Sequence, residues 1–164
     1  MKNQLNELYN SMVCYYSGDP KRIQHFIKVH SFARLIGEME ELDSDTLTTL
    51  EAAAYVHDIG IKPAELKYGS SNGKLQEQEG PSAARHMLSH LNFSAEKIDR
   101  ICYLVGHHHT YTNIDGLDYQ ILVEADFLVN LFEDGESKET AERVLNKIFK
   151  TSFGSHLCKT MFNL

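Results

Sequence analysis

The sequence predicts an all-α protein, folded as a single bundle of about six to eight helices. Apolar residues recur every three or four positions along nearly the whole chain, which is the period of a helix that buries one face. No segment shows the sustained alternation of apolar and polar residues that is typical of a half-buried strand. The 164 residues, 42% of them hydrophobic, are enough for one domain over 1–164 with its own core.

The first two helices are predicted from an apolar stripe and a helix start signal. Residues 3–16 carry apolar side chains on one helical face. The second helix begins with Asp19 as N-cap and Pro20 at the first helical position, and its stripe continues to about Met39. This start signal is clear, because the cap accepts a free backbone N–H and the proline lacks one.

The middle of the chain is predicted to hold a third helix and then an exposed loop. Ser44 can cap this helix, Gly60 ends it, and Pro63 blocks its continuation. The following stretch, residues 66–78, contains three turn-forming residues and is therefore expected to be a loop.

Further helices are expected after this loop. Pro81 opens the fourth helix of the chain, and Ser94 caps the fifth. Two more cover about 118–133 and 136–149. The C-terminal helices, within 136–164, are expected to pack on the rest of the same domain.

Charge and cysteine content restrict the class of function. Sixteen Lys and Arg against 23 Asp and Glu leave a formal net charge of −7. A nucleic-acid polymer is therefore not an expected partner, because proteins that bind one present clustered basic surface. A small phosphorylated molecule can still bind where metal ions supply positive charge. The three cysteines are widely spaced, which favours reduced thiols in a cytosolic protein over a disulfide framework.

The N-terminus and the hydropathy pattern favour a cytoplasmic protein with no membrane partner. The opening residues, MKNQLNELYN, have no apolar core resembling a signal peptide. The most apolar stretch, YQILVEADFLVNLF, is interrupted by Glu124 and Asp126 and is too short to span a bilayer.

Polar side chains lie on or beside the predicted apolar stripes of four helices. These residues are His25, His57, Asp58, His108, His109 and Asp126. Burying an unpaired carboxylate costs several kcal/mol, so Asp126, between Leu122 and Val129, needs a partner or a metal. A single histidine on an apolar face is usually a hydrogen-bonded core residue. Four helices that direct imidazole and carboxylate groups inward are instead typical of a metal centre in a bundle.

The order of these residues resembles the HD superfamily of metal-dependent phosphohydrolases, over roughly residues 20–132. His25 lies in RIQHFIKVHSFARLIGE, which is similar to the first motif of that family, with an arginine three residues earlier and a valine four residues later. The adjacent His57 and Asp58 lie in AAAYVHDIG, and Asp126 lies in VEADFLV. The motif favours His25 over His30 as the ligand, which leaves His30 for packing or support.

A second motif suggests the branch of the family that binds more than one metal ion. The string HHHTYTNIDG resembles the HHE stretch of the HD-GYP phosphodiesterases. By this resemblance His108 and His109 are ligands and His107 is the extra histidine. Ile61 follows HDIG where HD-GYP enzymes have a lysine, and the GYP element is absent. Hydrolysis of cyclic-di-GMP is therefore not expected.

A third string, EGPSAARHML, is similar to a segment in which dinuclear members, including the diadenosine tetraphosphate hydrolase branch, carry a further histidine ligand. Glu79 occupies that place here, and a carboxylate can also bind a metal ion. Glu77 and Gln76 remain alternatives for the matching position.

The resemblance implies two divalent transition-metal ions, with Fe, Mn, Zn, Ni and Co equally suitable. One ion is assigned to His25, His57, Asp58 and Asp126, and the other to Asp58, Glu79, His108 and His109. Asp58 has two oxygens and is the natural bridging ligand. Ions roughly 3.5–4 Å apart can share a water, lower its pKa and present hydroxide to a phosphorus atom.

The predicted function is hydrolysis of a phosphate ester or anhydride in a nucleotide or similar small phosphorylated metabolite. Asp58 and Lys62 are the predicted catalytic residues, and Arg22 and Lys28 the predicted phosphate contacts. The alternative is a non-catalytic sensor that binds a metal ion or nucleotide. An apolar stripe near the end of the chain serves either a homodimer interface or the core. It consists of Val144, Leu145 and Ile148.

Overall fold

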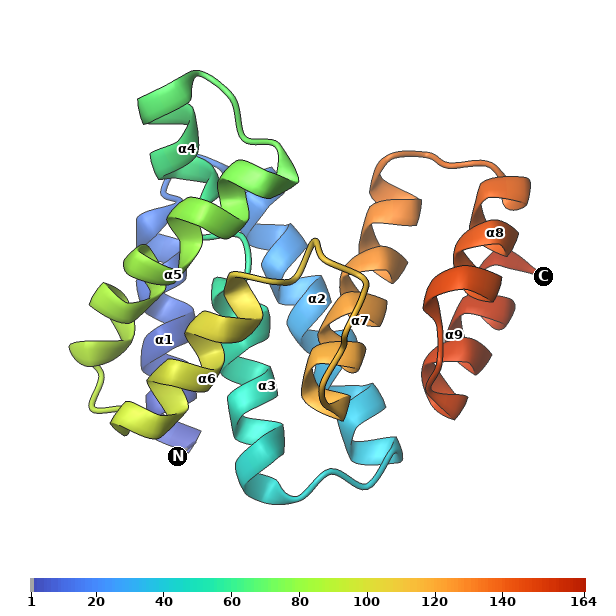
Figure 1. Ribbon diagram of the computed structural model, residues 1–164, viewed down its shortest axis with the longest axis horizontal. Coiled ribbons are helices and arrows are strands. Elements are labelled where there is room, and N and C mark those ends of the chain that lie inside the picture. Colours follow the sequence, from blue (N-terminus) through green and yellow to red (C-terminus); the bar gives the residue numbers. More distant parts are fainter. Residues whose placement is uncertain (1) are drawn as a thin grey trace.

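The computed structural model describes residues 2–164, the side chain of Lys2 excepted, and this range forms nine α-helices and no strand (Figure 1). The predicted all-α fold is therefore confirmed. In chain order the helices are α1 (Lys2–Tyr15), α2 (Pro20–Met39), α3 (Ser44–Val56), α4 (Ile61–Tyr68), α5 (Gly73–Ser89), α6 (Ala95–Val105), α7 (Leu117–Glu133), α8 (Lys138–Ile148) and α9 (Ser152–Phe162).

Short polar side chains start several of these helices. Asp19 accepts a hydrogen bond from the backbone N–H of Arg22, and Pro20 occupies the first position of α2, as predicted. Ser94 caps α6, also as predicted. The N-cap of α3 is Asp43 and not Ser44, which lies one position inside the helix. The Asp43 carboxylate accepts hydrogen bonds from the free backbone N–H groups of Asp45 and Thr46. Ser44 lies one residue further along the chain and is not the residue that caps them.

The predicted loop over residues 66–78 is mostly helical. Helix α4 continues to Tyr68, and α5 begins at Gly73 after a short turn. Pro63 does not prevent α4, because it lies in the first turn, where a missing N–H costs no intrahelical hydrogen bond. Gly69 ends α4 in the left-handed conformation with φ 64°, and Asn72 caps α5. The turn-forming residues therefore mark two helix ends and not a long loop.

Pro81 lies inside α5 and does not open it. The helix already starts eight residues earlier, at Gly73. A proline inside a helix removes the hydrogen bond to the carbonyl four residues before it, and α5 continues as a helix without that bond. The sequence signal was ambiguous, because proline marks both helix starts and interruptions.

Helices α2, α3 and α7 form the centre of the fold, with α1, α5 and α6 packed on one side and α8 and α9 on the other (Figure 1). One hydrophobic cluster includes Leu8 of α1, Leu50 of α3, Leu122 of α7 and Cys158 of α9. Residues of the C-terminal helices therefore belong to this cluster. Val144, Leu145 and Ile148 are partly buried against this core.

Glu124 of α7 attaches the C-terminal pair of helices. Its carboxylate has no exposed surface and accepts hydrogen bonds from Gln120 Nε2 at 2.6 Å and from Thr151 Oγ1 at 2.6 Å. It also accepts the backbone N–H groups of Lys150 and Thr151 at the start of α9. A buried carboxylate is tolerated here because several donors surround it.

None of the helices in residues 2–164 combines the length and apolar character needed to cross a membrane.

Candidate metal centre

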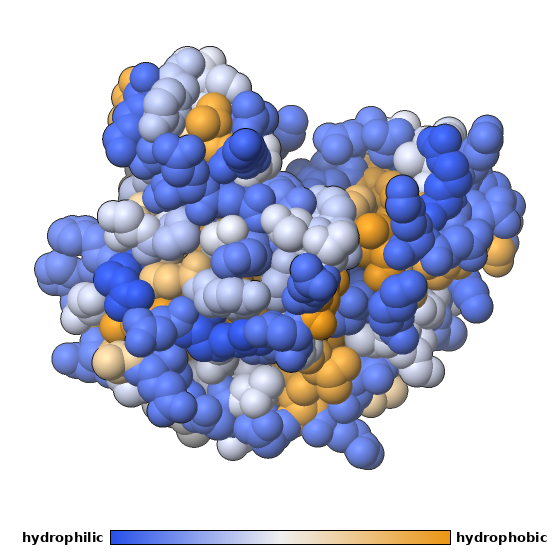
Figure 2. All heavy atoms as spheres, in the orientation of Figure 1, coloured by the Kyte–Doolittle hydropathy of each residue, from blue (hydrophilic) through white to orange (hydrophobic). Residues whose placement is uncertain are grey.

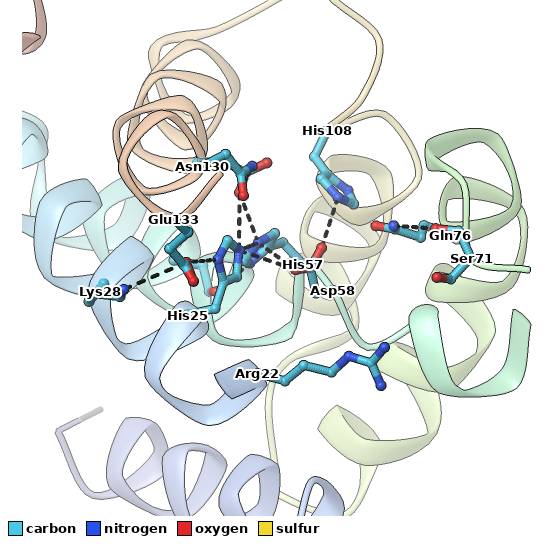
Figure 3. A network of polar contacts seen from close by, with 12 residues as sticks. Arg22, His25, Lys28, His57, Asp58, Ser71, Gln76, His108, Asn130 and Glu133 are labelled. Atoms are coloured by element: carbon cyan, nitrogen blue, oxygen red, sulfur yellow. Dashed lines mark hydrogen bonds and ion pairs between the residues drawn. The ribbon is translucent and has the colours of Figure 1, made fainter. Parts of the chain in front are cut away.

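The inward-facing polar residues predicted from the sequence meet at the centre of the bundle (Figure 3). His25 comes from the middle of α2, His57 and Asp58 follow the last turn of α3, and Asp126 comes from the middle of α7. His108 lies just after the end of α6. Helix ends and helix middles from distant parts of the sequence therefore meet at one point.

Three of these residues form the first triad, defined as His25, His57 and Asp126. Their potential ligand atoms lie within 4.8 Å of one another. The two Nε2 atoms are 3.2 Å apart, and Asp126 Oδ1 lies 3.2 Å from His25 Nε2 and 3.4 Å from His57 Nε2. His57 has no exposed surface, and Asp126 is 4% exposed. This is a buried pocket of nitrogen and oxygen donors.

Hydrogen bonds on the far side of each ring determine which nitrogen faces the pocket. Nδ1 of His57 contacts the Ala54 carbonyl at 2.7 Å, and Nδ1 of His25 contacts Glu133 Oε1 at 2.6 Å. Because carbonyl and carboxylate oxygens only accept, each Nδ1 carries the proton. In the neutral rings both Nε2 atoms then point lone pairs at each other, and a shared cation relieves this repulsion.

The second triad is Asp58, His108 and His109, and its potential ligand atoms also lie within 4.8 Å of one another. Nδ1 of His108 contacts the Val105 carbonyl at 2.8 Å, so its Nε2 carries the lone pair. That Nε2 is buried, lies 3.4 Å from Asp58 Oδ1, and has no hydrogen-bond partner among the described residues. A buried nitrogen acceptor without a partner is a ready ligand for a metal ion.

Asp58 connects its own triad to the first one. Its Oδ2 is 3.2 Å from His25 Nε2 and 3.4 Å from His57 Nε2, while its Oδ1 faces His108. The backbone carbonyl of Asp58 accepts a hydrogen bond from Tyr16 Oη at 2.7 Å, which holds the corner after α3 in place. Imidazole and carboxylate donors around orphaned lone pairs fit divalent transition-metal ions.

The same geometry perturbs the protonation of the first triad. Burial lowers the pKa of His25, but hydrogen bonds with Asp126 and Asp58 outweigh it and raise the pKa to about 11. The pKa of His57 is raised to about 10 for the same reasons. Burial raises the pKa of both carboxyl groups, yet the imidazoles hold the pKa of Asp58 and of Asp126 well below its usual range. Protons therefore take the place of a cation when none is bound.

His109 behaves differently from the other histidines. Burial, followed by the neighbouring His108, lowers the pKa of His109 to about 4, so its ring is neutral at pH 7. Its Nε2 lies 2.8 Å from Gln76 Oε1. The Gln76 amide is oriented by its Nε2, which donates to the Ser71 carbonyl at 2.6 Å. His109 therefore donates from Nε2 and keeps its lone pair on Nδ1.

Glu79 lies outside both triads. Its carboxylate accepts from Lys67 Nζ at 2.7 Å and from Tyr68 Oη at 3.0 Å. Glu77 accepts from the Thr110 hydroxyl. Of the three positions considered from the sequence, Gln76 is the one that lies beside the second triad. Lys67 and Tyr68 contact Glu79 because α4 packs along α5. The sequence predicts a loop over these residues and therefore does not indicate this contact.

A cavity of about 410 Å³ opens beside the two triads. Arg22 lines it, with its guanidinium 2.5 Å from Glu65 and 3.2 Å from Asp19. Lys21, which the sequence analysis did not single out, lines it as well. Two predicted residues do not. Lys28 lies 3.6 Å from Glu133 Oε1, and Lys62 Nζ donates to the Tyr15 carbonyl at 3.1 Å in a neighbouring hollow.

Two supporting residues were missed in the sequence. Asn130 donates to Asp126 Oδ1 at 3.0 Å, and Glu133 holds His25. Both line the cavity. They follow Asp126 by four and seven positions, which places all three on one face of α7. The helical period alone could therefore have found them.

The two histidines that the sequence analysis set aside lie outside the cluster. His107 stacks on Tyr103, with ring centroids 4.1 Å apart. His30 lies 3.0 Å from Glu51 Oε1 and stacks on Tyr55.

Comparison with known proteins places this site in a family. Residues 22–148 match the model of the HD domain. Among solved structures, the fold is similar to that of a predicted HD superfamily hydrolase from an uncultured Thermotogales bacterium. The TM-score is 0.69 at 24% identity, and the match covers 96% of this chain and 84% of the other, which is a likeness of fold. The comparison with curated proteins gives no match. The matched range contains every residue of both triads, and the chain belongs to the HD domain family.

Proposed function

We propose that the protein is a phosphohydrolase that works with two divalent metal ions. The observation that carries the proposal is the position of Asp58, because one of its oxygens faces the histidines of the first triad and the other faces His108 of its own triad. The solved structure of similar fold is described as a predicted HD superfamily hydrolase, which supports the same class. The substrate is a phosphate ester or anhydride of a nucleotide or another small phosphorylated metabolite.

The chain supplies ligands and orientation, and the ions supply charge. When bound, two divalent ions neutralise phosphate oxygens and lower the pKa of a shared water. Asp58 holds both sites at a fixed separation because each of its oxygens serves one of them. Glu133, Ala54 and Val105 each accept an Nδ1 proton, which keeps the Nε2 lone pairs directed at the ions.

The cavity makes anion binding depend on the ions. Besides Lys21 and Arg22, its wall includes the carboxylates of Asp19, Glu133 and Asp134. Arg22 is already paired with Glu65 and Asp19. Without metal ions the carboxylates that line the cavity would repel a phosphate, and bound metal ions would neutralise this charge. Lys21 and Arg22 are therefore assigned to orient the phosphate rather than to provide its main attraction.

In the proposal Asp58 is the residue that would hold both ions, one through each of its oxygens. Lys62 and Lys28 receive no role in the proposal, because neither lines the cavity and each already has a partner. Gln76 takes the place of Glu79 beside the second triad.

The test measures metal content and phosphate release on the same preparations. Wild type, His57→Ala and Asp58→Ala are loaded with Mn²⁺, dialysed, and assayed against a panel of nucleotides and sugar phosphates. His107→Ala is the matched control, because this histidine stacks on Tyr103 outside both triads. We expect the full metal complement and released phosphate in wild type and control only. Metal binding without any phosphate release would instead favour the non-catalytic sensor.

A further inference from the structure

A second hollow, called here the α8 groove, lies between α7, the segment after α6 and α8. Its volume is about 540 Å³. Tyr111, Phe127, Val144 and Ile148 form its apolar part. Figure 2 shows hydrophobic atoms exposed in the hollow between the body of the molecule and the α8–α9 pair. The rings of Tyr111 and Phe127 are 5.1 Å apart and tilted by 56°, so they present two aromatic surfaces.

The α8 groove is positively charged in an acidic protein. Arg143 and Lys147 line it, one helical turn apart on α8, and no carboxylate among the described residues does. The cavity at the metal centre, by contrast, has several acidic residues in its wall. The two hollows therefore have opposite charge before any metal ion binds.

Arg143 differs from the other arginines of the described chain in having no carboxylate partner. Its Nη2 donates only to the Thr140 hydroxyl, at 3.0 Å. The remaining arginines each form an ion pair, and these are Arg22, Arg34, Arg85 and Arg100. The Arg143 guanidinium keeps donors free for an anionic ligand, which it can bind in bidentate geometry.

The same two segments, α7 and the stretch after α6, line both the α8 groove and the cavity at the metal centre. Phe127 follows Asp126 directly on α7, and Tyr111 lies two residues after His109. A ligand long enough to extend along these two segments can therefore reach both hollows. Aromatic surface, a free guanidinium and this proximity describe a place for the part of a substrate that does not react.

We infer that the α8 groove binds the organic part of the substrate, which is an aromatic molecule carrying a second anionic group. This inference rests on the proposed function. The reacting phosphate lies at the two triads, the aromatic body lies against Tyr111 and Phe127, and the second anion pairs with Arg143 and Lys147. The preferred substrates are thus phosphorylated aromatic compounds, such as nucleotides, with two separated anionic groups.

The test compares three probes on the zinc-loaded full chain by ¹H–¹⁵N NMR titration. Adenosine 3′,5′-bisphosphate has both anions, adenosine 5′-monophosphate lacks the second, and inorganic phosphate lacks the aromatic body. We expect the bisphosphate to shift amide signals of residues 110–112, 127 and 140–148, and phosphate to shift only those around the triads. A charge-assisted contact predicts about tenfold tighter binding of the bisphosphate than of the monophosphate.

Arg143→Gln is the test variant and Lys138→Gln its control, because Lys138 is an exposed cation on the same helix outside the groove. We expect Arg143→Gln to bring the affinity ratio of the two nucleotides to about one, and Lys138→Gln to preserve it. Thermal melting checks that both variants are folded. The inference would be overturned if the ratio of the two nucleotide affinities is the same in wild type and Arg143→Gln. It would also be overturned if no probe shifts the amide signals of the groove residues.

Phosphate release from the two nucleotides is measured separately. Groove binding without release would contradict the proposed function and leave the groove in place as a binding site. Release without groove shifts would support the proposed function and refute the inference.

Discussion

Gly60, the N-cap of α4, lies against the backbone of α5, and replacing it with alanine tests how the metal centre is assembled. A Cβ at this position would lie 2.5 Å from the Gln76 carbonyl oxygen and 2.8 Å from the backbone nitrogen of Gly80. Both neighbours are backbone atoms, so no side-chain rotation relieves the contact. To reach an ordinary 3.4 Å contact, α5 would have to retreat by about 0.9 Å.

The cost can be worked out from this overlap. Overpacking costs about 1–3 kcal/mol, and two backbone contacts place Gly60→Ala near the top of that range. The backbone entropy that glycine loses on folding returns about 0.4–1 kcal/mol, because Gly60 has ordinary helical dihedral angles. The net loss is about 2 kcal/mol, which lowers Tm by about 4–8 °C in a chain of this size.

The retreat of α5 also affects the second triad. Gln76 moves with α5, and its 2.8 Å contact with His109 would lengthen beyond hydrogen-bonding range. Removing such a supporting contact weakens metal binding by about 10–100-fold. Gly60→Ala is therefore expected to retain one metal equivalent on dialysis and to lose the other.

Circular dichroism melting and metal analysis after dialysis measure both effects. Gly106→Ala is the control, since it is also a helical-conformation glycine and its nearest new contact, 3.1 Å, is to the Pro81 side chain. The reasoning is refuted if Gly60→Ala melts within about 1 °C of wild type. It is equally refuted if both variants lower Tm by the same amount.

Three other predictions concern the metal ions and the C-terminal helices. His108→Ala should lose about half of a two-ion complement, as measured by metal analysis, whereas His107→Ala should keep nearly all of it. Without metal, the raised pKa values of His25 and His57 mean that their stabilising contribution is full below pH 6.5 and declines as pH rises toward 10. Metal ions displace these protons, so the Tm difference between metal-loaded and EDTA-treated protein should widen from pH 6 to pH 9; a constant difference would contradict this. Glu124→Gln replaces a buried acceptor oxygen with an amide N–H group that faces the donors of Gln120 and Thr151. It should lower the free energy of unfolding by about 1–3 kcal/mol in denaturant unfolding, with unchanged metal content.

The sequence by itself determined most helices and the identity of the polar residues that meet in the two triads. Caps such as Asp19 and Ser94 act within one turn, so local sequence is sufficient to place them. His57 and Asp126 stood out because a polar group on an apolar stripe must find a partner when that stripe is buried. Such signals need only the helical period, which is a local property of the chain.

Tertiary structure alone decided which neighbouring groups complete the site. Glu79 and Gln76 lie within one turn of α5, and their sequence does not indicate which of them faces His109. The packing of the Gly60 backbone against α5 brings this helix beside the site, and Gln76 is the residue in contact with His109. Lys62 follows the HD pair closely in sequence, yet α4 directs it to the Tyr15 carbonyl. These choices depend on how whole helices approach one another, and the packing of backbone against backbone that sets this approach joins residues far apart in the chain.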